Sequence, residues 1–124
     1  MESYGWELEH RLVDFAVLIL KLTESMSNIM GAKTLARQLT RSGTAPALNY
    51  AEARAAESDR DFIHKMKLCL KELRESQVCL RIILKMHYGD EARVKIVSDE
   101  CHELVAIFYS SIRTRQKTLL CQPR

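Results

Sequence analysis

The stretch Arg41–Phe62, RSGTAPALNYAEARAAESDRDF, decides how this 124-residue chain folds. It is rich in small residues, which are Ser42, Gly43, Thr44, Ala45, Ala47, Ala51, Ala53, Ala55 and Ala56. The distance between packed helices depends on the side chains at their contact, so a helix with small side chains lets its neighbours approach closely. We therefore interpret this stretch as the central packing helix of an all-helical protein.

Two features of the stretch set its shape and its exit. Pro46 lacks a backbone N–H and clashes with the preceding turn, which predicts a kink near Gly43–Pro46. Helical spacing resumes at Asn49, so the helix is expected to continue beyond the kink. Ser58 or Asp59 is a good N-cap for the next helix. The short connection predicts that the two helices are antiparallel neighbours.

Apolar residues at steps of three and four predict helices over residues 3–26, 32–57, 59–87 and 91–117. The predicted inward seams are Leu8, Leu12, Phe15, Ile19, Leu22 and Met26 in the first helix; Leu35 and Leu39 in the second; Phe62, Met66, Leu70, Leu73, Gln77, Leu80 and Leu84 in the third; and Val94, Val97, Cys101, Leu104, Phe108 and Ile112 in the fourth. The predicted fold class is therefore all-α, with one domain over residues 1–124 that forms an antiparallel up-down-up-down four-helix bundle.

Two of these helices carry more apolar surface than one bundle core needs. The additional rows are Val13, Val17 and Leu20 in the first helix, and Leu68, Cys79, Ile82 and Met86 in the third. On an isolated bundle these rows would face water. We therefore expect oligomerisation through them.

Composition and motifs argue against several functional classes. The four cysteines form no CxxC pair and lie in or after apolar patterns, which indicates buried thiols in a reducing compartment. The chain starts without a signal pattern, and its longest apolar run, Phe15–Leu20, is too short for a membrane span, so we expect a cytoplasmic protein. A Gly-rich phosphate loop, an HExxH motif and a nucleophile elbow are all missing. We predict no enzyme activity, no catalytic residue and no cofactor.

Acid–histidine pairs at a spacing of three residues occur in di-metal bundles. The chain contains three similar pairs: Glu7 with His10, Asp61 with His64, and Asp99 with His102. Metal ligands must project into the bundle, and helical geometry turns these pairs away from the predicted seams. We therefore predict no metal site.

Basic residues line one side of the third helix. They are Lys67, Lys71, Arg74, Arg81 and Lys85, here called the basic track. We interpret the basic track as a surface for phosphates, and the alternative is an ordinary solvated helix face. Arg37 and Arg41 are secondary candidates, and Arg113, Arg115 and Lys117 extend the charge. No aromatic residues interleave, so we expect RNA or DNA binding with weak sequence preference.

Several polar residues have a structural interpretation. Arg41, Asn49 and Glu52 on the second helix are expected to meet Glu72 and Ser76 on the third. Inward polar groups in a bundle must find partners, so we predict a polar network that ties the two helices together rather than a catalytic centre.

The chain resembles a bacterial family of small four-helix-bundle proteins that are encoded in intervening sequences of large-subunit ribosomal RNA genes and were mislabelled as ribosomal proteins. The strongest matches are Gln38–Ala53 and Ser58–Ile83, and Glu7–Leu20 fits the opening helix. At Val78 and Cys79 the chain departs from an aromatic pair that the family often carries. The resemblance implies a ring-like homopentamer. In a related branch, the accessory variability determinant of diversity-generating retroelements, the protein binds nucleic acid and a reverse transcriptase. The resemblance to that branch implies nucleic-acid binding here, and this chain is less basic than that branch.

These observations together predict a non-enzymatic homo-oligomer, an accessory or scaffold protein that binds RNA or DNA through basic surfaces and does not contact membranes. The alternative is a protein-interaction module without a nucleic-acid role, whose apolar rows receive a helix of a protein partner.

Overall fold

The computed structural model describes residues 2–121, with side chains from residue 4 onward. Residue 1 and residues 122–124 of the predicted domain lie outside the described residues. The described part of the chain has no strand, and its four helices are α1 (Glu2–Glu24), α2 (Met30–Arg54), α3 (Asp59–Met86) and α4 (Glu91–Leu120). The all-helical, four-helix architecture expected from the sequence is therefore confirmed.

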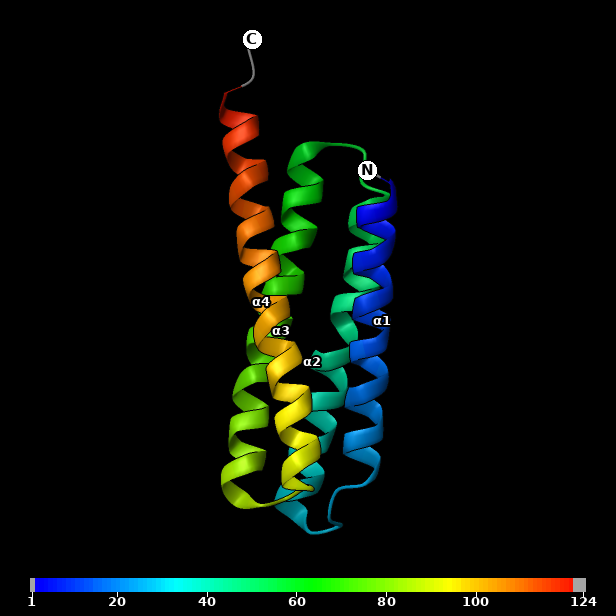
Figure 1. Cartoon of the computed structure of the whole chain (residues 1–124), viewed down its shortest axis with the longest axis vertical. Helices are drawn as coiled ribbons and strands as arrows, with labels where there is room; N and C mark the ends of the chain where they lie inside the picture. Colours follow the sequence, from blue (N-terminus) through cyan, green and yellow to red (C-terminus); the bar gives the residue numbers. More distant parts are fainter. Residues whose placement is uncertain (1, 122–124) are drawn as a thin grey trace.

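The four helices surround one core, and the backbone of each helix lies close to those of two neighbours. α1 contacts α2 and α4, and α3 also contacts α2 and α4, whereas α1 and α4 share the least extensive contact. The connections α1–α2 and α3–α4 meet at one end, where the Ser27 N–H donates to the Tyr88 carbonyl at 3.4 Å. The α2–α3 connection lies at the other end, near the start of α1, and α4 runs past it (Figure 1).

Local hydrogen bonds set the helix ends. α2 ends at Arg54 rather than at residue 57, because the Ala55 and Ala56 N–H groups close tight turns onto Glu52 and Ala53. Ser58 is the N-cap of α3 and accepts from the Asp61 N–H at 3.1 Å. α4 continues to Leu120, beyond the predicted residue 117.

The core residues of α1 and α4 agree with the predicted seams. All six seam residues of α4 are buried, and so is the α1 seam from Leu8 to Leu22. Met26, the last seam residue of α1, is only half-buried. The outer row Val13, Val17 and Leu20 is exposed, with exposed fractions of 46%, 43% and 36%.

The predicted seam of α3 is partly wrong. The buried residues are Ile63, Met66, Cys69, Leu73, Ser76, Leu80 and Ile83. Four predicted members, Phe62, Leu70, Gln77 and Leu84, are only half-buried and flank this row. The physical reason lies in α2, because its Ser42 and Pro46 contact Ser76 and Cys69, so small polar groups of α3 point inward at these levels.

The small residues of α2 bring its backbone close to both neighbours. A Cβ atom added at Gly43 would lie 2.6 Å from Ile19 Cγ1 of α1, which is closer than real Cβ atoms approach. On the α3 side, Ser42 Oγ lies 2.9 Å from Ser76 Oγ. α2 remains helical through the buried Pro46, whose carbonyl accepts from the Cys69 thiol at 3.5 Å. Close packing on two sides of α2 therefore supports the fold.

The cysteines fall into two groups, which corrects the expectation that all are buried. Cys69 and Cys101 are buried, and burial raises the pKa of each thiol to about 12. Cys79 is half-buried and Cys121 is exposed.

In the described part of the chain, no helix is long and apolar enough to cross a lipid bilayer.

Replacing Gly43 by Ala tests the close approach of α1 and α2. The added methyl group must displace Ile19, and we expect a loss of about 1–2 kcal/mol in unfolding free energy despite the higher helix propensity of Ala. Urea denaturation monitored by circular dichroism measures this loss. Gly5→Ala is the matched control, because its Cβ would meet the flexible end of Arg54 at 3.3 Å and the Tyr50 hydroxyl at an ordinary contact distance of 3.6 Å. Equal stability of the two variants would contradict the prediction, and Ile19→Ala combined with Gly43→Ala should lose less than the sum of both.

Candidate nucleic-acid interface

The basic track lies on the outward side of α3. Lys67, Lys71, Arg74, Arg81 and Lys85 are all exposed, and none of them forms an ion pair with a described residue. They follow one another at steps of four, three, seven and four residues. Side chains at such spacings lie on the same face of a helix. The structure therefore brings all five together as an unneutralised row.

Arg41 is not part of this row. It donates from Nη1 to Glu72 Oε1 at 2.9 Å and from Nη2 to Glu75, and these bonds join α2 to α3. The hydrogen bond to Glu75, followed by that to Glu72, raises the pKa of Arg41 above its ordinary value. The contact with Glu72 confirms that Arg41 belongs to the predicted polar ties between α2 and α3, and its role as a secondary phosphate candidate stays a prediction. By engaging both carboxylates, Arg41 leaves the neighbouring Lys71 and Arg74 without an acidic partner.

Arg37 is exposed but lies elsewhere. It lines a shallow surface depression between α1 and α2, together with Thr23 and Glu24 of α1. No residue of α3 lines this depression. The structure therefore does not bring Arg37 to the basic track.

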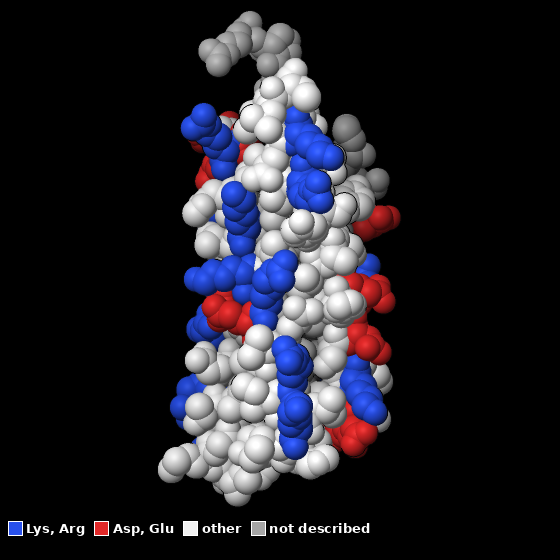
Figure 2. All heavy atoms as spheres, turned by 90° about the vertical axis from the view of Figure 1, so that its left-hand side faces the viewer, with Lys and Arg blue, Asp and Glu red and all other residues white. Residues whose placement is uncertain are grey.

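The adjacent helix α4 adds charge selectively. Arg113 and Lys117 are exposed and form no ion pair with a described residue, and the Arg113 guanidinium lies 5.8 Å from the centre of the exposed Tyr109 ring. Arg115 instead packs over Phe62 at 4.1 Å and donates to Asp59 at 3.1 Å, so it does not extend the track. Figure 2 shows Lys and Arg along the length of the side that α3 and α4 form, with most acidic residues towards one edge.

The predicted polar network separates into independent contacts. Ser76 bonds to buried Ser42 and also donates to the Glu72 carbonyl at 3.1 Å. Glu52 is exposed and accepts from Lys65 at 2.6 Å, and the Asn49 side chain has no hydrogen bond to a described residue. Glu52 therefore meets α3 as predicted, but through Lys65 and at the surface rather than inward, whereas Asn49 has no partner on α3. Two of the predicted contacts between α2 and α3 are present: Ser42 with Ser76, and Arg41 with Glu72.

Ion pairs join α1 to α4 and to α2, and the sequence did not indicate them. Arg11 donates from Nε and Nη2 to the two carboxylate oxygens of Glu100 on α4, at 2.7 and 2.9 Å, and also to Glu103 at 2.6 Å. Arg54 of α2 bonds to Glu9 of α1 at 2.9 Å. Their partners are far apart in the sequence, so helical spacing alone gave no signal for them.

The acid–histidine pairs lie on the surface. Glu7, His10, Asp61, His64, Asp99 and His102 are all exposed. His102 Nδ1 lies 3.4 Å from Gln77 Nε2, so this pair contacts a neighbouring helix rather than a second acidic group. Within residues 2–121 no group of three or more His, Cys, Asp or Glu side chains is placed to hold a metal ion.

The fold and this surface define a class: a small all-helical protein of four amphipathic helices with one basic side. Residues 7–110 match the model of the 23S rRNA-intervening sequence protein family, and the chain belongs to this family. The resemblance inferred from the helical runs is therefore confirmed.

A solved structure shows the same fold. The chain is similar to a protein with unknown function from the S23 ribosomal protein family of Bacteroides thetaiotaomicron, seen in a crystal structure, with 28% identity and a TM-score of 0.78. The match covers 84% of this chain and 96% of that chain. No curated protein sequence matches significantly.

The Ser42–Ser76 contact provides a test of the tie between α2 and α3. Ser76→Ala leaves the buried Ser42 hydroxyl without its partner on α3, and we expect a loss of about 1 kcal/mol in unfolding free energy. The double variant with Ser42→Ala should lose less than the sum of the two single variants, because it leaves no unpaired hydroxyl. Urea denaturation of the four proteins measures this coupling. Strict additivity of the two losses would show that the contact contributes nothing.

Proposed function

We propose that this protein is a non-enzymatic accessory or scaffold protein that binds RNA or DNA through the basic track. One observation carries the proposal: five exposed cations of α3 lack ion-pair partners among the described residues. Arg113 and Lys117 of the adjacent α4 are also exposed and form no ion pair with a described residue. Such a row attracts a polyanion, because each phosphate that it neutralises releases counterions.

The dimensions of the row suit a nucleic-acid backbone. From Lys67 to Lys85 the helix rises roughly 27 Å at about 1.5 Å per residue, a length that several successive phosphates of one strand occupy. Long, flexible lysine and arginine side chains reach phosphates without reading base edges. The proposed binding is therefore weakly dependent on sequence and strongly dependent on salt.

We also propose that the antiparallel up-down-up-down bundle assembles as a homo-oligomer, a pentamer as the family resemblance implies. The outer row of α1 supports this, since Val13, Val17 and Leu20 stay exposed on the side opposite the buried seam. Trp6, which is 53% exposed, continues the row at a helical spacing of seven residues. A symmetric oligomer would cover these rows and repeat the basic track around the assembly.

The same exposed row favours a second candidate function. In a monomeric protein the outer row of α1 would remain open to a partner helix, as in helix-in-groove recognition. The protein would then be an interaction module without a nucleic-acid role. The mass of the protein in solution distinguishes the two, because self-association uses the row that the partner would need.

Removing two cations of the basic track tests nucleic-acid binding. For the variant Lys71→Gln with Arg74→Gln we expect weaker binding of a fluorescently labelled single-stranded RNA. The slope of log affinity against log salt should fall by roughly 1.5, at about 0.7 per lost phosphate contact. Fluorescence anisotropy across a KCl series measures both. The matched control, Lys21→Gln with Arg93→Gln, removes the same charge from exposed residues of α1 and α4 and should retain the wild-type slope. No binding at low salt, or a flat salt response, would contradict the proposal.

Charges placed in the outer row of α1 test self-association. We expect Val13→Glu with Val17→Glu to convert the oligomer to folded monomers, because assembly would bury uncompensated carboxylates. Size-exclusion chromatography with light scattering gives the mass, and circular dichroism confirms the helical content. Leu48→Glu is the control, since Leu48 of α2 is 67% exposed and lies outside the row. A monomeric wild-type protein would exclude self-association and favour the interaction module.

A further inference from the structure

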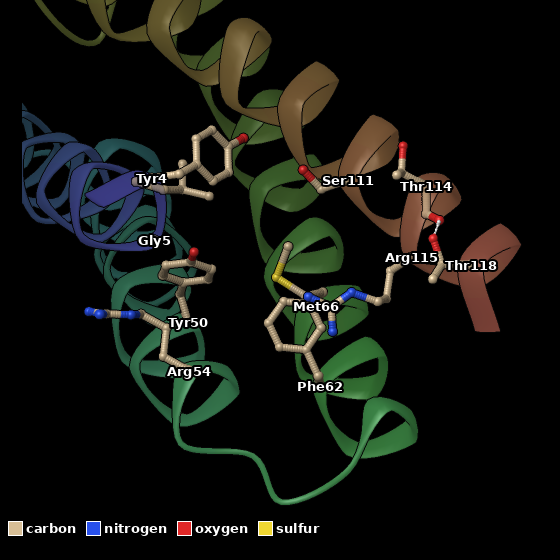
Figure 3. A pocket seen from close by; sticks show the side chains of 11 residues that line it. Tyr4, Gly5, Tyr50, Arg54, Phe62, Met66, Ser111, Thr114, Arg115 and Thr118 are labelled. Atoms are coloured by element: carbon tan, nitrogen blue, oxygen red, sulfur yellow. Dashed lines mark hydrogen bonds between the residues drawn. The ribbon is translucent and has the colours of Figure 1, made fainter. Parts of the chain in front are cut away.

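A cavity opens at the end of the bundle where α1 begins and α4 ends. It has a volume of about 560 Å³, and side chains from all four helices line it (Figure 3). Its walls include α1 and α4, the pair of adjacent helices with the least extensive contact. The Arg11 ion pairs to Glu100 and Glu103 tie these two helices closer to the middle of the bundle. This volume falls within the range of small-molecule sites.

Tyr50 contributes a hydroxyl to the cavity lining. The residue is only 4% exposed, and its ring packs edge-on against Phe108 with centroids 5.8 Å apart. Its hydroxyl makes no hydrogen bond to a described residue, and no fully buried side-chain nitrogen or oxygen of the described residues lacks a partner, so the Tyr50 oxygen is accessible from the cavity. Burial raises the pKa of the Tyr50 hydroxyl, so at neutral pH it is a protonated donor.

Arg115 supplies a cation from the opposite wall. Its Nη1 donates to Asp59 at 3.1 Å, and its guanidinium lies over the Phe62 ring (Figure 3). This bond occupies one nitrogen, and Arg115 makes no other hydrogen bond to a described residue. Arg54 also lines the cavity, but its guanidinium points away from α4 towards Glu9 and Trp6. Arg115 keeps its ion pair with Asp59, and its remaining guanidinium N–H groups are the cationic donors that we assign to a ligand in the cavity.

The remaining lining combines an apolar floor with hydroxyl groups. Leu8 and Met66 provide the floor beside Phe62, and Tyr4 and Ser111 provide hydroxyls from α1 and α4. No carboxylate lines the cavity. Such a lining favours a ligand that is apolar on one side and carries hydrogen-bond acceptors and negative charge on the other.

We propose that this cavity binds a small amphipathic organic anion, with its acidic group on Arg115 and an acceptor on the Tyr50 hydroxyl. The apolar part of the ligand lies against Leu8, Phe62 and Met66. The site differs from the basic track, which uses side chains on the outward side of α3. It is therefore independent of the proposed nucleic-acid binding, and either can fail without the other.

Two matched dyes and three variants test this proposal in the full-length protein. The probes are 8-anilinonaphthalene-1-sulfonate, an aromatic anion, and N-phenyl-1-naphthylamine, which lacks the sulfonate. Fluorescence titration gives the affinities, and isothermal calorimetry gives the stoichiometry per chain. We expect one strong site that prefers the sulfonate dye. Tyr50→Phe should weaken sulfonate binding about five- to tenfold, as expected for one lost hydrogen bond, and should not change the melting temperature.

Arg115→Met should weaken sulfonate binding more than tenfold and abolish the preference between the dyes, because it removes the charge. Arg113→Met is the matched control on the same helix, outside the cavity lining, and should bind both dyes like the wild type. Should Arg115→Met fail to fold, Tyr50→Phe still decides, because phenylalanine keeps the packing of the ring. Equal sulfonate affinity of the wild type and Tyr50→Phe, or equal affinity of the wild type for both dyes, would overturn the proposal.

Discussion

The close approach of α2 to α1 and to α3 is the constraint on which this structure depends. At Gly43 there is no room for a Cβ atom beside Ile19, and one residue earlier Ser42 meets Ser76. The backbones of α1 and α3 do not approach each other closely, whereas α2 lies close to both, so the small side chains of α2 set the distance to each. A bulkier helix at this place would push α1 and α3 outward and open the core at the level of Phe15 and Leu73, which are fully buried.

The sequence predicted the core of α4 and α1 because each has one unambiguous apolar row at helical spacing. α3 carries two interleaved rows, and the choice between them depends on α2. Cys69 and Ser76 are weak apolar signals, yet they face the core because Pro46 and Ser42 lie opposite them. Periodicity within one helix favours Leu70 and Gln77 instead. The register of α3 is thus a tertiary property, which explains why its seam was predicted only in part.

For the candidate surface, the sequence likewise indicated what depends on one helix and did not indicate what depends on contacts between helices. The exposure of Lys71 and its row could be predicted, since charged residues at helical spacing normally lie on a solvated face. Arg41 and Arg115 could not be assigned in this way, because their guanidinium groups reach carboxylates on other helices. The cavity beside Tyr50 was missed for a related reason, since side chains from all four helices line it and the pattern of one helix does not indicate it.

The bundle therefore has one tightly packed edge and one weakly held edge. The α2–α3 edge combines close backbone approach, a buried hydroxyl pair and the Arg41 ion pairs. The α1–α4 edge relies more on the half-exposed Arg11 pairs, and partly solvated ion pairs contribute only about 0–1 kcal/mol each. The cavity lies at the end of the bundle where α1 begins and α4 ends, and side chains of both helices line it. A ligand that contacts Arg115 and Tyr50 would bridge α4 and α2 across this end of the bundle, and it would stabilise the folded protein in proportion to its occupancy.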